Sequence, residues 1–521
     1  REPGGEPLSV FVGVDVGSQS LKAVVLDDDL HIAGIGRRAY PIAFPRPGWA
    51  EQSPELWEAA LGPAIADALA AAGRRPSDVR GLGLAGQLDG CIPTERAGTP
   101  LHPCLIWMDR RADSVLDGVR RRIAPSELRA RTGANLDGTH MAPKIRWCLD
   151  HLPATREADC FHQPVSYLVA RLTGSRVIDH GMASTSLVYD LERADYADDL
   201  LDAFGLERDR LPAPAPSESQ AGRLTAAGAA LTGLPPGTPV AVGTGDDFST
   251  PLGGGVVAPG TIANVLGTAE VVGALHTQPL VDSTALLETH RFVGSGLSYI
   301  ENPGWVSGGA LEWLRGLLSL DDFVVADRLA ATVPAGSDGL LFLPALTGAM
   351  TPEWNADARG CFYGLTPSHG PGALVRAALE GTAFGLRDVA MRLAEMGVAT
   401  SRVRLLGGGA RSRLWAQIRA DATGLPVERP QVTDTSPLGA GLLAAVACGA
   451  FPDITAAAAQ VAKAAETIEP DVALRGVYDD AYGRYRQLFA SLKPMFGGTG
   501  PNAAAPADNE VEKCRTASSQ N

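Results

Sequence analysis

The chain has 521 residues, which is too long for one ordinary hydrophobic core, so we expect two domains. Hydrophobic residues make up 45% and charged residues 20%, which is typical of a globular protein. The formal net charge is −14 and no cluster of lysine and arginine stands out. Both features argue against nucleic acid or an anionic membrane as a default partner.

Seven cysteines are scattered along the chain without a CxxC pair. This spacing indicates neither a zinc site nor a disulfide framework, and it favours reduced thiols in the cytoplasm. No apolar run is long enough to span a bilayer, and no secretory signal precedes Phe11. We therefore expect a cytoplasmic protein, with a disordered end at residues 1–8 and a disordered tail at residues 493–521.

The first predicted element is a hairpin between Val10 and Asp27, in which two β-branched runs flank a polar turn. The turn, Asp15 to Ser20, offers a carboxylate, a glycine, hydroxyls and free amides. Such a turn can surround phosphate oxygens, with Asp15 facing Mg²⁺ or its water shell. The alternative is an ordinary hairpin whose side chains satisfy the turn amides. Taken alone, the turn favours this alternative.

A helix is predicted to begin at Ser53-Pro54, and a buried strand is predicted over Val79–Ala85. The strand runs into the polar loop 86–90, and open α/β sheets bind ligands at the carboxyl ends of their strands. Further on, a short apolar run ends in Asp109-Arg110. A structural ion pair and direct contact with a ligand are both open for this pair.

The central stretch, residues 240–270, breaks at the acidic pair Asp246 and Asp247 and continues through a triple glycine. Carboxylates on a glycine-rich loop after a strand suit a group that must approach a substrate hydroxyl closely. We interpret Asp246 as the general base of a phosphoryl transfer at the place where two domains meet.

A second hairpin is predicted over Thr261–Leu275, with Gly267 and Thr268 in its turn. Two similar hairpins, one early in each half, suggest duplicated domains that hold one polyphosphate between them. This repetition favours a phosphate-binding role for both turns. The preceding segment, residues 211–237, is expected to be irregular.

The second half adds a strand, a triple glycine and a helix over residues 403–422. This order is typical of a nucleotide site, because a glycine backbone can lie against a base or a phosphate, although a triple glycine alone is weak evidence. Two further helices are predicted, one opening at residues 304–309 and a long one over 371–395. A small-residue helix, 436–450, is expected to pack behind the triple glycine.

In this order, the segments resemble the FGGY family of carbohydrate kinases, and within it most of all the xylulose kinases. The similar segments are GVDVGSQSLKA (13–23), GWAEQSPELW (48–57), GDD (245–247), GCFYGLTPSHGPGALVRAALEG (360–381) and LLGGGARSRLWAQIRAD (405–421). The resemblance extends from about Phe11 to Phe489. It implies an α/β fold of two duplicated actin-like, RNase H-like domains of the Hsp70/actin/hexokinase ATPase type, with a cleft between them. The sugar-binding domain would span residues 9–252 and the nucleotide-binding domain residues 253–492.

The resemblance also implies the reaction, a transfer of the γ-phosphate of ATP to a sugar hydroxyl with Mg²⁺ as cofactor. Asp246 would accept the hydroxyl proton, and Asp15 and Asp246 would hold Mg²⁺ through water. The residues expected to bind ATP are Gly17, Ser18, Gln19, Ser20, Gly267, Thr268, Gly308, Gly408, Gly409, Ala410 and Ser412. Those expected to contact the sugar are Gln87, Leu88, Asp89, Trp107, Asp109, Asp246 and Asp247.

The chain departs from the xylulose kinase pattern where the sugar would be read. In the usual GQMHG motif, Met is replaced by Leu88 and His by Asp89. The usual Asn after the catalytic Asp is Asp247, and a usual GER is Gly-Ala-Met at residues 348–350. Asp89, Asp246 and Asp247 would crowd negative charge into one pocket and disfavour acceptors that carry a phosphate or a carboxylate.

We therefore expect a kinase of a ketopentose such as D-xylulose, or of a related ketose, polyol or cyclitol. One alternative is an amino-substituted or cyclitol acceptor, and another is a non-catalytic sugar- or nucleotide-binding regulator on the same fold. Retention of Asp15, Asp246 and Thr268 argues against the regulator. The expected partner is a small sugar or polyol, with no nucleic acid and no membrane, and a homodimer is an open alternative.

Overall fold

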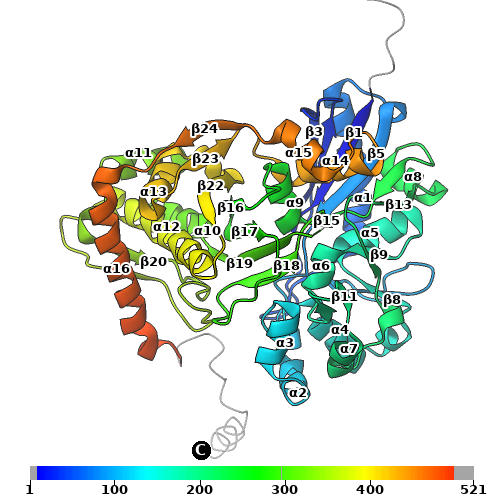
Figure 1. Cartoon of the computed structure of the whole chain (residues 1–521), viewed down its shortest axis with the longest axis horizontal. Coiled ribbons are helices and arrows are strands. Elements are labelled where there is room, and N and C mark those ends of the chain that lie inside the picture. The colour runs from blue at the N-terminus through cyan, green and yellow to red at the C-terminus, as the bar shows by residue number, and fades with distance from the viewer. Residues whose placement is uncertain (1–8, 295, 498–521) are drawn as a thin grey trace, which may run out of the picture.

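The computed structural model describes residues 9–294 and 296–497. Two large sheets lie side by side with helices around them (Figure 1). The expected disordered end at 1–8 and the tail from residue 498 lie outside the described residues. The tail was predicted to begin at residue 493, which is wrong for its first part. Lys493–Met495 forms a 3₁₀ turn, and the ring of Phe496 packs 5.4 Å from that of Phe489.

The first sheet has the strand order β13-β14-β5-β1-β2-β3, and β15 pairs with the end of β5. Its β1 and β2 are buried along nearly their whole length, as expected for a sheet that is covered on both faces. The strands are β1 (Val10–Val16), β2 (Ser20–Leu26), β3 (Ile32–Ala39), β5 (Val79–Gly86), β13 (Gln220–Arg223), β14 (Pro239–Ala241) and β15 (Thr244–Gly245).

The second sheet repeats this topology in the order β24-β23-β22-β16-β17-β19-β18. In each sheet an antiparallel meander of three strands is followed by two parallel strands and one antiparallel strand. The predicted duplication is therefore confirmed, and β18 is an additional edge strand. The strands are β16 (Gly260–Leu266), β17 (Ala269–His276), β18 (Glu288–Arg291), β19 (Ser298–Val306), β22 (Thr400–Leu406), β23 (Val427–Pro430) and β24 (Ala464–Ile468).

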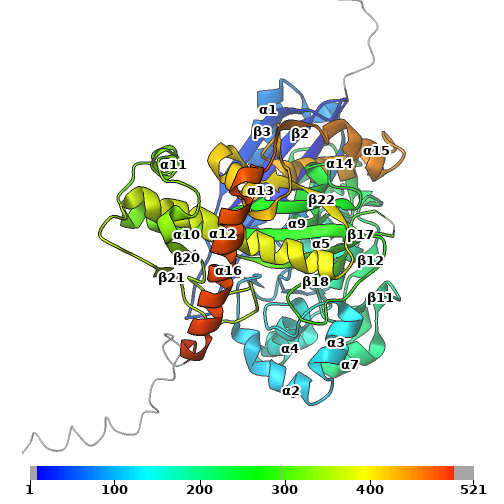
Figure 2. The same cartoon turned by 60° about the vertical axis from the view of Figure 1, so that its left-hand side comes forward.

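Helices surround both sheets. The helices α12 and α13 pack on the second sheet, and α16 lies across them (Figure 2). In the first half the helices are α1 (Pro54–Ala72), α2 (Leu116–Arg120), α3 (Pro125–Thr132), α4 (Met141–His151), α5 (Pro164–Thr173), α6 (His180–Ser184), α7 (Asp198–Phe204), α8 (Ala226–Thr232) and α9 (Asp246–Gly253). In the second half they are α10 (Gly308–Leu317), α11 (Phe323–Ala331), α12 (Pro371–Glu395), α13 (Arg413–Thr423), α14 (Thr435–Ala447), α15 (Ile454–Val461) and α16 (Arg475–Leu492). Within residues 9–294 and 296–497, no helix is both long and apolar enough to cross a membrane.

Short strand pairs complete the fold, and in the sequence most of them lie between β5 and β14. They are β4 (Glu51–Gln52) with β7 (Cys104–Leu105), β6 (Ile92–Thr94) with β8 (Cys160–His162), β9 (Val177–Asp179) with β12 (Ala213–Ala215), β10 (Tyr189–Asp190) with β11 (Asp195–Tyr196), and β20 (Leu341–Leu343) with β21 (Cys361–Tyr363). The six cysteines in the described part of the chain are unpaired.

The two halves are joined by a close crossing of α9 and α14. A Cβ atom on Gly253 would lie 1.9 Å from the carbonyl oxygen of Thr435, and one on Gly439 would lie 2.2 Å from that of Ser249. The other side of α14 packs on β1 and β5, where a Cβ on Gly83 would lie 1.9 Å from the Ala440 oxygen. Only glycine fits such contacts, so this small-residue composition allows the two backbones to touch.

This arrangement corrects the expectation that the helix over residues 436–450 packs behind the triple glycine. The helix, α14, comes from the second half of the chain but lies on the first sheet. The expected division between residues 252 and 253 falls inside α9. The two halves therefore share α9 and α14 rather than meeting at a simple boundary.

Two further local expectations are wrong. Residues 211–237 are not irregular, because they contain β12, β13 and α8. Residues 304–306 end strand β19, and the helix α10 begins only at Gly308. In both places the many glycine, proline and small residues gave no local signal for the elements, which are stabilised by pairing with distant strands.

Gly439→Ala should destabilise the protein and slow its reaction, because the added methyl must separate α14 from α9. We expect a loss of about 1–3 kcal/mol in the free energy of unfolding, as for other overpacked sites. Gly483→Ala is the matched control, since a Cβ there meets nothing within 4 Å on α16. It should stabilise the protein by ~0.5–1 kcal/mol. Urea unfolding measures both, and equal stability of the two variants would contradict the crossing as described.

Candidate active site

Three strands of the first sheet end at one place. In the parallel register, Ala85 of β5 lies between Asp15 of β1 and Thr244 of β15. The loop after β5 therefore emerges beside Asp15 and beside Asp246, the residue that follows β15. The carboxyl ends of parallel strands are the usual ligand-binding edge of such a sheet. The predicted base, metal and sugar-reading residues are brought together at this edge.

Asp246 is the first residue of α9, rather than part of a glycine-rich loop as the sequence suggested. Gly245 precedes it and packs against Leu88, because a Cβ on Gly245 would lie 2.5 Å from Leu88 Cδ2. Burial, the charge of Asp247 and the charge of Asp15 raise the pKa of Asp246 well above its usual value. A carboxylate with a raised pKa is a stronger base, which suits the acceptance of a hydroxyl proton.

Asp15 is surrounded by groups from both halves of the chain. Burial raises its pKa to about 6, while the charge of Lys22 and the nearby Ser436 hydroxyl lower it and the charge of Asp434 raises it. Lys22 in turn donates to Asp434 with an Nζ–Oδ1 distance of 2.8 Å. Asp434 and Ser436, at the start of α14, were missed in the sequence, although the TPLG after Asp246 and the SPLG after Asp434 form a short repeat.

These residues fit a hydrated magnesium ion. The Oδ1 atom of Asp15 and the Oγ atom of Ser436 are both buried and have no hydrogen-bond partner. Carboxylate oxygens, water and phosphate oxygens are the ligands that Mg²⁺ prefers. No group of three His, Cys, Asp or Glu side chains converges to form a metal site within residues 9–294 and 296–497.

The first hairpin turn, residues 17–19, is fixed by aromatic side chains. The Tyr40 hydroxyl donates to the Gly17 carbonyl at 2.6 Å, and Trp107 Nε1 donates to Ser18 Oγ at 2.8 Å. Trp107, which was expected at the sugar, is thus also tied to a residue expected at ATP. Ser20 is buried, and its hydroxyl accepts a hydrogen bond from Arg37 at 3.0 Å.

The second hairpin turn is held from two sides. The Gly308 N–H, at the start of α10, donates to the Gly267 carbonyl at 3.1 Å. Beyond the turn, the carboxylate of Glu270 is fully buried with Arg419 of α13, whose Nη2 donates to it at 2.8 Å. A buried, bidentate ion pair fixes geometry strongly. It locks the turn with Thr268 against the helix that follows the triple glycine.

The segment expected at adenosine is built tightly against the hairpin. A Cβ on Gly409 would lie 2.3 Å from Leu266 Cγ, and Gly408 has open space where a side chain would stand. Ser412 caps α13, because its Oγ accepts the Trp415 N–H at 3.0 Å. Ala410 is buried. Of these residues, Gly408 is therefore the one whose surface is open to a ligand.

Asp89 is the partly exposed end of a buried polar network. Its Oδ1 accepts a hydrogen bond from the Thr185 hydroxyl at 2.7 Å, and its Oδ2 lies 3.2 Å from His140 Nδ1. Lys144, which is fully buried, donates to the Asp89 carbonyl oxygen at 2.7 Å. His140 Nε2 lies 3.8 Å from Glu288 in β18. No local sequence pattern pointed to His140 or Glu288, because their role arises only from tertiary contacts.

The second half contributes further acids to this side. Burial and the charge of Asp89 raise the pKa of Asp247 to about 6, and the nearby His290 lowers it. Burial and the surrounding carboxylates, Asp247 first, raise the pKa of Glu301 well above its usual value. The crowding of negative charge expected from the sequence is thus larger than Asp89, Asp246 and Asp247 alone, and histidines lie among the acids.

Two residues expected at the sugar are placed differently. Asp109 is fully buried, with its carboxylate bonded to the Arg111 guanidinium and to the Ala50 N–H. It forms a structural ion pair, but with Arg111 instead of Arg110. Gln87 is also buried and donates to Gln52 at 2.8 Å, although its Oε1 has no partner. The structure therefore assigns Asp109 to support rather than to a ligand surface.

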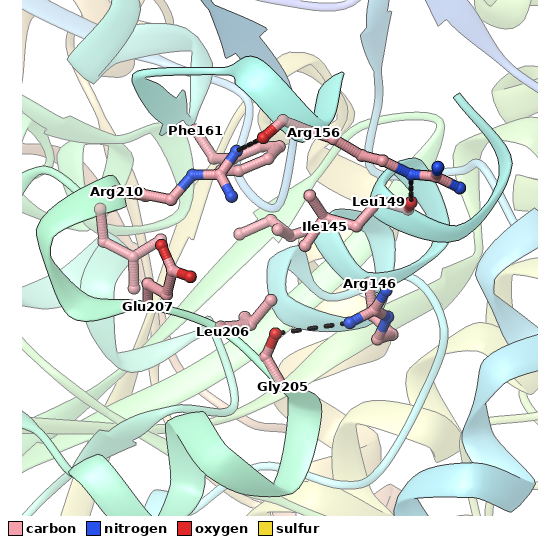
Figure 3. Close-up of a pocket in the computed structure, with 10 residues that line it drawn as sticks. Ile145, Arg146, Leu149, Arg156, Phe161, Gly205, Leu206, Glu207 and Arg210 are labelled. Atoms are coloured by element: carbon pink, nitrogen blue, oxygen red, sulfur yellow. Dashed lines mark hydrogen bonds between the residues drawn. The ribbon is translucent and has the colours of Figure 1, made fainter. Parts of the chain in front are cut away.

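A cavity of about 220 Å³ lies elsewhere, between α4 and the segment that follows α7 (Figure 3). Its walls are mainly apolar, and Arg210 at its edge donates to the carbonyl oxygens of Thr155, Ala158 and Arg156. Another arginine, Arg146, is paired with Asp150. None of the residues expected to bind ATP or sugar lines this cavity, so it is separate from the site at Asp246.

Comparison with known proteins agrees with this geometry. Residues 10–253 match the N-terminal domain of the FGGY family of carbohydrate kinases, and residues 262–448 match its C-terminal domain. The chain belongs to this family. FGGY kinases use ATP and Mg²⁺ to phosphorylate an alcohol group, and this chain is an enzyme of that kind.

Two groups of FGGY kinases are similar to the chain. The glycerol kinase of Thermus brockianus is 34% identical over 458 residues, which cover 85% of this chain and 91% of that protein. The crystal structure of xylulose kinase from Rhodospirillum rubrum has a TM-score of 0.85 and 30% identity, and it covers 94% of this chain and 99% of that one. The family is therefore confirmed, while the narrower assignment to xylulose kinases is not.

Asp15→Asn should increase the Mg²⁺ concentration needed for half-maximal activity by about tenfold, because it removes a charge that we expect to face the metal's water shell. Asp28→Asn, on an exposed turn beyond β2, is the matched control and should leave this value unchanged. ADP release measured over a range of Mg²⁺ concentrations tests both. An unchanged Mg²⁺ requirement in the Asp15 variant would contradict its placement at the metal.

Proposed function

We propose that this FGGY kinase phosphorylates a hydroxyl group of a neutral polyol, with Asp246 as the general base. The observation that carries the proposal is the carboxylate of Asp89, which is close enough to act on Asp247, the residue after the base. Thr185 donates to one of its oxygens, the His140 ring lies 3.2 Å from the other, and its side chain keeps 16% of its surface exposed. Each oxygen of a carboxylate can accept more than one hydrogen bond, so Asp89 can still accept hydrogen bonds from a ligand.

Asp89 would distinguish a hydroxyl from a carbonyl. An ionised carboxylate only accepts hydrogen bonds, so it binds a hydroxyl group and repels a ketone oxygen. A histidine, which the xylulose kinase motif has at this position, can donate to a ketone oxygen instead. A site that leaves a polar group unpaired in the wrong ligand discriminates strongly. The chain should therefore prefer a polyol over the corresponding ketose.

The other acids refine this expectation. Asp247 and Glu301 would repel an acceptor that already carries a phosphate or a carboxylate. An amino-substituted polyol or a cyclitol would be tolerated. D-xylulose is the second candidate, which is favoured by the structural similarity to the Rhodospirillum rubrum xylulose kinase.

In the proposed reaction, the acceptor hydroxyl attacks the γ-phosphorus of ATP while Asp246 takes its proton. A bond forms between the acceptor oxygen and phosphorus, and the bond from phosphorus to the bridging oxygen of ADP breaks. Mg²⁺ would neutralise charge on the phosphate oxygens, near Asp15. The turns at Ser18 and Thr268, one from each half, would hold the phosphates, and the glycines at 408–409 would lie against adenosine.

Matched pairs of acceptors test the proposal. ADP release from Mg-ATP is measured with glycerol and dihydroxyacetone, and with xylitol and D-xylulose. We expect kcat/KM to be at least tenfold higher for a polyol than for its ketose. Asp246→Asn should lower kcat by about 10²- to 10⁴-fold, which is the range for loss of a general base. Asp28→Asn should behave as the unmodified protein. Faster turnover of the ketose in both pairs would contradict the polyol assignment.

A further inference from the structure

The strand β18 belongs to the second sheet but is anchored to the first half. Its Thr289 N–H donates to the Gly133 carbonyl at 3.0 Å, and its Arg291 N–H donates to Ser184 Oγ at 3.0 Å. The carboxylate of Glu288 accepts the Asn135 N–H at 2.8 Å. This edge strand has no counterpart in the first sheet. It therefore lies against segments of the first half that are close to Asp89.

His140 is the residue that links β18 to Asp89. It lies at the start of α4 and is 95% buried, with one ring nitrogen 3.2 Å from Asp89 and the other 3.8 Å from Glu288. Glu288 also lies 3.6 Å from His290. A histidine between two carboxylates holds its proton, and each carboxylate is then compensated by the imidazolium. The chain thus has an imidazolium next to position 89, although position 89 itself is an acid.

We propose that His140 is a positioning residue that holds the Asp89 carboxylate in place, and thereby sets the preference of the site for hydroxyl groups. This inference rests on the polyol kinase function proposed above. Asp89 lies near Asp247 and Glu301, whose charges act on one another. Without the imidazolium, the Asp89 carboxylate would be repelled by these neighbouring acids and would turn away. A carboxylate that has turned away neither accepts from a hydroxyl nor excludes a ketone oxygen, so the preference would be lost.

Two substitutions separate the two contacts of His140. The amide nitrogen of asparagine stands about where Nδ1 stands, so His140→Asn keeps a donor towards Asp89. The amide nitrogen of glutamine stands nearer Nε2, so His140→Gln keeps a donor towards Glu288 and loses the one towards Asp89. Both remove the positive charge. His162→Asn is the matched control, because His162 is equally buried but its ring bonds to Ser166 of α5 and not to the Asp89 carboxylate.

The test is a double-mutant cycle of Asp89→Asn and His140→Gln, with kcat and KM measured for the four acceptors and KM for ATP. His140→Gln should raise the KM of the polyols about tenfold or more, lower the polyol-to-ketose ratio by a similar factor, and change the KM for ATP less than twofold. His140→Asn should show a smaller loss. Because His140 acts through Asp89, the double variant should be within twofold of Asp89→Asn alone.

Each outcome decides the inference. Losses that multiply in the double variant, an unchanged polyol-to-ketose ratio in His140→Gln, or an equal loss in His162→Asn would overturn it. If His140→Gln does not fold, the same cycle with His140→Asn decides, since a neutral asparagine also removes the charge. Absence of Asp246-dependent turnover on either polyol in the unmodified protein would instead overturn the proposed function itself.

Discussion

The close crossing of α9 and α14 is the constraint on which the site depends. At Gly253 and Gly439 the two helix backbones touch, and neither position has room for a side chain. This contact joins the halves of a duplicated fold beside the site, and both helices begin near the end of β1. The acid that starts α9, Asp246, and the polar start of α14 at Ser436 are therefore both placed beside Asp15. A small-residue helix that looks like ordinary packing is thus what assembles a site from two domains.

The site gathers buried carboxyl groups that a bound cation or a hydrogen-bond donor of a ligand would stabilise. Burial and mutual repulsion raise the pKa values of Asp15, Asp246, Asp247 and Glu301. Magnesium would compensate the acids on the phosphate side, while hydroxyl donors would satisfy those on the acceptor side. His140 supplies a protein cation between Asp89 and Glu288, so the charge near Asp89 is balanced before any ligand arrives. Catalysis and acceptor selectivity would then both depend on which carboxylates have no cationic partner within the protein.

The sequence was sufficient to predict the features that repeat or that depend on residues close in the chain. These include the duplicated domains, the two hairpins and the edge that carries Asp246. It was insufficient where contacts between residues far apart in the chain determine the role of a residue. A lone histidine such as His140 has no pattern that predicts its two acidic neighbours. Asp109 looked as available as Asp89, and only burial with Arg111 separates them. The short elements between residues 211 and 237 were missed because pairing with distant strands, rather than local propensity, creates them.

The most direct measurement is a crystal structure of the protein with a non-hydrolysable ATP analogue, Mg²⁺ and the polyol that it turns over fastest. We predict that one acceptor hydroxyl lies within about 2.6–3.2 Å of the Asp246 carboxylate and in line with the γ-phosphorus, while a second hydroxyl donates to Asp89. An acceptor bound without contact to Asp246, or one that presents a carbonyl oxygen to Asp89, would contradict this account.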